Sequence, residues 1–148
     1  MNENETTRLD EILKNASPND LSKFSKEELQ GKLPSLADYL NEYIAKHNLS
    51  VPEIIKQSLL SKDYAYAILN GNRKNPTKDR IIALCLAMHM NLKSAERALK
   101  LNDMVLYSKN KRDAAIIICF NREIYDIDKV NYFLEDNELP ILETSKVS

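Results

Sequence analysis

The chain contains 148 residues, of which 43% are hydrophobic and 29% are charged, with only two glycines and no tryptophan. A chain of this length can bury a hydrophobic core without metal ions or disulfides, and the scarcity of glycine disfavours a fold rich in β-turns. The net charge of −1 argues against a strongly basic protein that binds nucleic acid without sequence preference. We therefore expect an all-α fold.

The sequence shows no membrane or secretion signal. No apolar stretch approaches the roughly 18 residues that a membrane-spanning helix requires, and the N-terminus lacks the apolar core of a signal peptide. Cys85 and Cys119 lie within apolar runs, where a thiol usually packs as a small hydrophobic residue. We expect a cytoplasmic protein with no membrane partner.

The first 34 residues are expected to form a helical extension. Three apolar residues at helical spacing predict a short amphipathic helix over residues 6–15. Residues 19–33 carry few apolar side chains and are followed by Pro34, which is typical of an irregular connector. We place a domain boundary there.

Four helices are predicted in the middle of the chain, each preceded by a residue that can cap it. Ser50 and Glu53 form a capping-box pattern, and Gly71 suits the left-handed position that follows a helix end. The expected helices are 36–46 after Ser35, 51–57 after Ser50, 62–69 after Ser61 and 78–88 after Thr77. The second and third are short and joined by a tight connector.

Several positions in this region match a known pattern: Leu49-Ser50 before the second helix, Ser61 and Ile68 in the third, Asn70-Gly71 at its end, the basic loop before Pro76, and Met90-Asn91-Leu92. With these residues the chain resembles the Cro-like and xenobiotic-response-element-like helix-turn-helix repressors. The resemblance covers a third to two-fifths of the chain. It implies a phage-repressor-like bundle over residues 35–101, in which helix 62–69 enters the major groove of double-stranded DNA.

The resemblance also implies which residues contact DNA. The recognition helix would present Ser61, Lys62, Asp63, Tyr66 and Asn70 to the duplex, and Arg73, Lys74, Lys56 and Lys78 would meet backbone phosphates. Base contacts would make the protein a sequence-specific regulator of transcription. Proteins of this class commonly form homodimers that bind two half-sites.

Other residues favour a different function. The family usually has Gln, Ala, Gly and an acidic residue where this chain has Val51, Ile55, Leu59 and Leu69. Residues 64–69 are mainly apolar, and a helix that is apolar all round is more often buried. The alternative is a protein-binding adaptor on a helix-turn-helix scaffold that has lost DNA binding, with a partner held by this helix or by the C-terminal hairpin.

Residues 75–82 and 110–117 match at an offset of 35, and the match continues through the helices that follow. A period near 35 residues with two helices per unit is typical of stacked helical hairpins. The predicted helices are 92–101 capped by Asn91, 111–122, and 127–136 capped by Asp126. Residues 102–148 would form a hairpin packed on helix 78–88, and the apolar run 116–120 would lie in the core or in a subunit interface.

The sequence offers little for catalysis. His47 and His89 are far apart and have no carboxylate or cysteine pattern around them. Two glycines cannot build a glycine-rich phosphate loop. We expect a protein that is not an enzyme, with no metal site and no cofactor.

Overall fold

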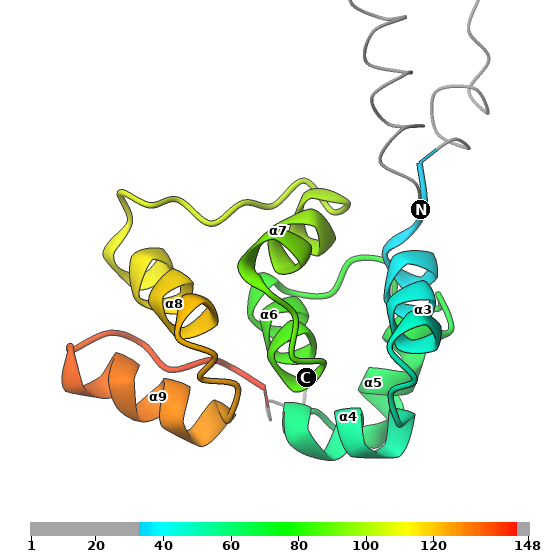
Figure 1. The fold of residues 1–148 in the computed structure, drawn as a ribbon, viewed down its shortest axis with the longest axis horizontal. Coiled ribbons are helices and arrows are strands. Elements are labelled where there is room, and N and C mark those ends of the chain that lie inside the picture. The colour runs from blue at the N-terminus through cyan, green and yellow to red at the C-terminus, as the bar shows by residue number, and fades with distance from the viewer. Residues whose placement is uncertain (1–32, 145–148) are drawn as a thin grey trace, which may run out of the picture.

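The computed structural model describes residues 33–144, and this part of the chain contains seven helices and no strand (Figure 1). The helices are α3 (Leu36–Lys46), α4 (Val51–Ser58), α5 (Lys62–Leu69), α6 (Lys78–Ala87), α7 (Leu92–Lys100), α8 (Lys111–Asn121) and α9 (Ile127–Asp136). The prediction of an all-α fold is confirmed. The helix and the connector expected within residues 6–33 lie outside the described residues, except for Leu33.

Each of the seven helices begins after a side chain that accepts a hydrogen bond from the backbone N–H three residues on. The capping residues are Ser35, Ser50, Ser61, Thr77, Asn91, Asn110 and Asp126. The sequence predicted all of these caps except Asn110. Ser50 Oγ caps α4 by accepting a hydrogen bond from the Glu53 N–H. The Glu53 carboxylate accepts a hydrogen bond from Gln57 Nε2.

Six of the connections that leave a helix pass through a non-glycine residue in the left-handed region: Asn48, Leu59, His89, Asp103, Glu123 and Glu138. The turn at Leu59 is described below. The hydrogen bonds at the other five are those of a Schellman ending. After α6, for example, the His89 N–H donates to Leu86 O and the Met90 N–H donates to Cys85 O. Among the described helices, only α5 is followed by a glycine in the left-handed region, Gly71, and the other six are followed there by a residue with a side chain.

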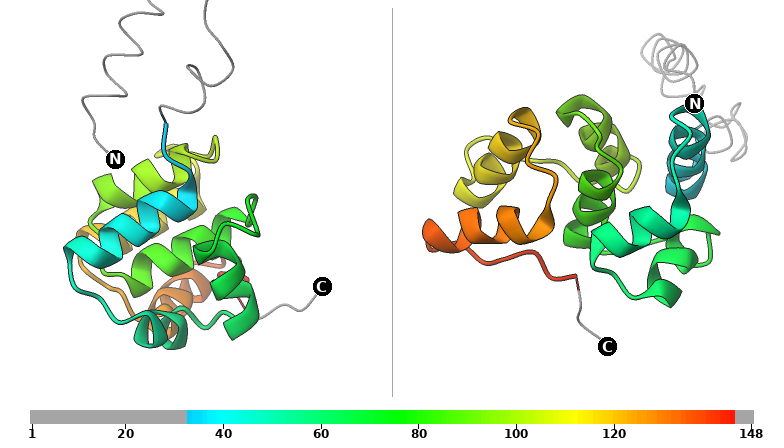
Figure 2. Two further views of the ribbon diagram at one scale, coloured as in Figure 1. Left: turned by 90° about the vertical axis from the view of Figure 1, so that its right-hand side faces the viewer. Right: turned by 60° about the horizontal axis from the view of Figure 1, so that its bottom comes forward.

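Helix α6 is the centre of the core. Every residue from Arg80 to Met88 is buried, and α6 packs against α4, α7 and α9. The right-hand view of Figure 2 places α6 and α7 in the middle, with α3 to α5 on one side and α8 and α9 on the other. Full burial of each large aliphatic side chain contributes about 1.5–3 kcal/mol. Much of the apolar stabilisation therefore lies in α6, the helix on which the sequence predicts the C-terminal hairpin to pack.

The two C-terminal hairpins share one backbone pattern. The Met104 N–H donates to Leu99 O after α7, and the Leu139 N–H donates to Leu134 O after α9. The caps Asn91 and Asp126 are separated by the same 35 positions. The period found in the sequence is thus present in the hairpins α6–α7 and α8–α9.

Two ion pairs join the beginnings of α6 and α8. Lys78 Nζ lies 2.9 Å from Asp113 Oδ2, and Arg112 Nη1 lies 2.9 Å from Asp79 Oδ1. Arg112 also donates to the carbonyl oxygens of Pro140 and Ile141. The ion pairs therefore hold the C-terminal segment, residues 139–144, as well as the two helices.

The apolar run 116–120 divides between core and surface. Ile116, Cys119 and Phe120 are buried, Ile117 is partly buried, and Ile118 is 44% exposed. Cys85 and Cys119 are both buried free thiols, as predicted. Among residues 33–144 no helix has the length and apolar character needed to cross a membrane.

Candidate nucleic-acid interface

The connector between α4 and α5 is a tight turn supported by a buried side chain. Ser58 Oγ donates to Ile55 O and accepts a hydrogen bond from the Leu60 N–H. Leu59 follows with φ of 60°, in the left-handed region. Ser58 thus holds the turn next to Leu59, whose left-handed conformation is strained for an L residue. No pattern in the sequence predicts this role of Ser58.

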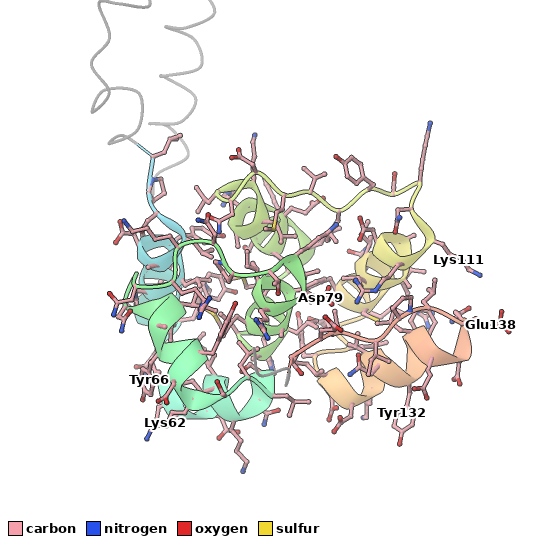
Figure 3. All side chains as sticks on the ribbon, turned by 180° about the vertical axis from the view of Figure 1, so that it is seen from behind. Lys62, Tyr66, Asp79, Lys111, Tyr132 and Glu138 are labelled. Carbon is pink, nitrogen blue, oxygen red and sulfur yellow. The ribbon has the colours of Figure 1, made fainter. Side chains whose placement is uncertain are left out.

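Helix α5 has one buried face and one open face. Ala65, Ile68 and Leu69 are buried, and α5 packs against α3. Lys62 and Tyr66 lie on the open face and point outward in Figure 3. The apolar composition of residues 64–69 therefore does not bury the helix on all sides.

The first turn of α5 is open to solvent. Ser61 caps the helix by accepting from the Tyr64 N–H at 3.2 Å, and Ser61, Lys62 and Asp63 are all exposed. Tyr66, one turn further on, is 39% exposed. These four predicted contact residues lie together at the beginning of one helix.

The loop after α5 has a defined backbone conformation. Asn70 Oδ1 accepts from the Asn72 N–H at 2.9 Å, and Gly71 adopts φ of 84°. The Arg73 N–H donates to Ala67 O at 2.9 Å. The Lys74 carbonyl accepts from Asn102 Nδ2 at 2.9 Å, so the loop is anchored both to α5 and to the segment after α7.

This loop presents basic side chains next to α5. Arg73 and Lys74 are exposed, as is Lys56 on α4. Residues 50–77 contain four basic and two acidic residues, although the whole chain has a net charge of −1. Such a local excess favours anionic partners.

Lys78 occupies a different environment. Its Nζ donates to both carboxylate oxygens of Asp113, and its side chain is only 30% exposed. Because its ammonium is paired with Asp113, Lys78 is not among the phosphate contacts that we propose.

An aromatic ring connects the loop to the core. The Arg73 guanidinium carbon lies 4.4 Å from the centroid of the Tyr64 ring, and that of Arg80 lies 4.2 Å from it. Tyr64 is partly buried and Arg80 is buried. The sequence places Tyr64 in the mainly apolar stretch 64–69 and does not reveal its contact with the two arginines.

A groove of about 730 Å³ lies at the other end of α6. Ile54, Met88 and Ile124 line it together with Glu53, and His89 stacks on Tyr125 with ring centroids 4.4 Å apart. Partial burial raises the pKa of the Tyr125 phenol. The sequence did not predict this groove, because its walls come from α4, the end of α6 and the turn between α8 and α9.

Among residues 33–144 no three His, Cys, Asp or Glu side chains gather where they could hold a metal ion. Comparison of the chain with protein-family models, curated proteins and solved structures gives no match. The arrangement of α4, α5 and the loop after α5 is therefore the feature that bears on function.

Proposed function

We propose that this protein binds double-stranded DNA through α5 and regulates transcription as a sequence-specific DNA-binding protein. In this proposal α4, the connector and α5 act as a helix-turn-helix. The observation that carries it is the open first turn of α5 beside a basic loop of defined conformation.

The arrangement suits a duplex for physical reasons. The major groove, about 12 Å wide, admits one helix, whose N-terminal residues meet the base edges. Lys62 and Tyr66 stand at that end of α5. Arg73 and Lys74 follow α5 in the chain, and the Arg73 guanidinium reaches back over the Tyr64 ring. Phosphate contacts from this loop would set the register of the helix.

One observation supports the adaptor alternative. Leu59 and Tyr66 are 42% and 39% exposed, and large apolar anchors of this kind carry much of the affinity in protein interfaces. In the adaptor alternative these two side chains would be the contact, and the charges of Arg73 and Lys74 would matter little.

We also propose that the protein acts as a homodimer. Helix-turn-helix proteins commonly pair so that two recognition helices meet half-sites one helical turn apart. Ile118 and Tyr132, in α8 and α9, are large and exposed. They offer apolar surface in the C-terminal half for such pairing.

The test measures binding of a labelled duplex pool of mixed sequence by the full chain, followed by selection of the retained sequences. We expect Lys74→Ala to weaken binding to all duplexes alike, with a salt slope smaller by about one unit. Lys62→Ala should change the preferred sequence, at about 1–3 kcal/mol for a base contact. Lys111→Ala is the matched control, because Lys111 is exposed in α8 on the other side of the molecule (Figure 3).

A wild-type chain that retains no duplex at about 50 mM salt would contradict the proposal, because phosphate contacts are strongest at low salt. If Tyr66→Ala then released a protein partner, the adaptor function would take its place. A loss of binding in Lys111→Ala equal to that in Lys74→Ala would also count against α5 as the DNA-binding element.

A further inference from the structure

We infer that Tyr64 is a positioning residue, whose ring holds the Arg73 guanidinium ready to bind a phosphodiester of the DNA backbone. This inference rests on the proposed function and adds to it a residue that need not touch DNA. The juxtaposition that carries it is the placement of two guanidinium carbons over one ring: those of Arg73 and Arg80 lie 4.4 Å and 4.2 Å from the Tyr64 centroid.

Arg73 is restrained at both of its ends. Its backbone N–H donates to Ala67 O at 2.9 Å, and its guanidinium carbon lies 4.4 Å from the Tyr64 ring centroid. An exposed arginine without such a contact samples many rotamers and loses that freedom on binding. The ring reduces this loss before any ligand arrives.

The placement over the ring leaves the arginine able to bind an anion. Contact with a ring uses the flat face of the guanidinium, whereas its N–H donors lie in the plane and point outward from the edge. Two of these donors match two oxygens of a phosphate. The Tyr64 ring therefore orients Arg73 without competing for the same donors.

The ring is itself held in place. Tyr64 lies in α5 and is partly buried, and its centroid lies 4.2 Å from the guanidinium carbon of the buried Arg80 in α6. Because α6 is the centre of the core, Arg80 connects the ring to the most deeply buried helix. The position of Arg73 is thus determined by the core.

The test uses a labelled duplex of mixed sequence, because phosphate contacts do not depend on the operator. We expect Tyr64→Leu and Arg73→Ala each to weaken binding, and the double variant to bind no more weakly than Arg73→Ala alone. Between about 50 and about 200 mM salt, Arg73→Ala should lose about three- to fourfold less affinity than the wild type, as expected for one phosphate contact removed. Tyr64→Leu leaves the charge of Arg73 in place and should keep most of the salt slope. Tyr64→Phe keeps the ring and should bind like the wild type.

Two further variants separate positioning from stability. Arg73→Lys keeps the charge without the planar guanidinium, so it should bind more weakly than the wild type while keeping most of the salt slope. Tyr107→Leu is the matched control, because Tyr107 is 65% exposed between α7 and α8, and it should leave binding unchanged. Thermal unfolding of every variant shows whether the fold is kept.

The possible failures are distinguishable. If the wild type shows no salt-dependent binding, the proposed function fails and this inference falls with it. Suppose that the wild type binds and that Arg73→Ala binds more weakly. Only the positioning role is then overturned if folded Tyr64→Leu binds normally, or if its effect adds fully to that of Arg73→Ala. Arg73→Lys that binds as tightly as the wild type also overturns it, even if Tyr64→Leu does not fold.

Discussion

Lys78 and Asp113 are joined by an ion pair of 2.9 Å between helices α6 and α8, and they are separated by 35 positions, the period that relates the two C-terminal hairpins. The neighbouring pair, Asp79 and Arg112, crosses the same seam. The two hairpins are therefore connected at their first turns by charge, while the rest of α6 is surrounded by apolar residues.

Asp113→Ala should lower the free energy of unfolding by about 2–3 kcal/mol. The buried carboxylate accepts from Lys78 Nζ and from the Tyr107 N–H, and both donors lose their partner. Lys78 is partly exposed and can reach water, which limits the loss. Urea unfolding measures the change. Glu135→Ala removes an exposed carboxylate in α9 and should change stability by less than about 0.5 kcal/mol; equal effects would contradict the structural role of Asp113.

Glu138→Gly should stabilise the protein by about 0.5–1 kcal/mol, because a side chain in the left-handed region is strained and glycine is not. Glu138 has φ of 59° and is exposed, so little packing is lost. Glu138→Ala keeps the Cβ and should be close to neutral. Gly71→Ala should act in the opposite direction, by about 1 kcal/mol, since Gly71 has φ of 84°. Thermal unfolding of the three variants checks the signs, and a destabilised Glu138→Gly would contradict the argument.

The stability of the protein should fall at alkaline pH through Cys85. Burial raises the pKa of this thiol from 9.0 to about 12, so the folded state keeps a proton that the unfolded state has lost. The stabilisation is complete below about pH 9 and declines as the pH rises from there toward 12, by at most about 1.4 kcal/mol per pH unit. Urea unfolding at about pH 8 and about pH 10 measures the decline.

Cys85→Ala is the comparison for this pH dependence. It should be less stable at neutral pH because it leaves a cavity, but its stability should depend less on pH than that of the wild type. Burial is the largest cause of the raised pKa of Tyr39, and this part of the shift is common to both proteins. Equal pH dependence in the two proteins would exclude Cys85 as a source.

Ile118→Lys should convert the proposed homodimer into a monomer. Ile118 is 44% exposed within a helix whose other large apolar residues are mostly covered, and a buried charge in an interface is costly. Ile118→Leu keeps the apolar surface and should remain dimeric. Light scattering at tens of micromolar gives the mass, and a monomeric wild type would remove the dimer.

The helices were predictable because their signals are local. Ser50 and Ser61 stand directly before α4 and α5, and each caps the helix that its sequence predicted. The apolar spacing of α6 also predicted a central helix on which the C-terminal hairpin packs. These features depend on residues within one or two turns of each other, where sequence patterns are informative.

The missed features depend on distant residues. The family resemblance implies a phosphate contact for Lys78, and the sequence neighbours of Lys78 do not reveal that Asp113 lies beside it. The segment 139–144 has no helical or strand period, and its position is set by Arg112, Asn131 and Asp79. The Tyr64 contact with Arg73 depends on how the loop after α5 folds back, which no periodic pattern specifies.

Helix α6 has a consequence for how the described part of the chain unfolds. One side of α6 is covered from the N-terminal half by α4, and another from the C-terminal half by α9. If either half opened, fully buried residues such as Ile82 and Leu84 would meet water. We therefore expect the two halves to share a single cooperative transition, and removing the chain after α7 should destabilise helices α3 to α7 instead of releasing them as an autonomous unit.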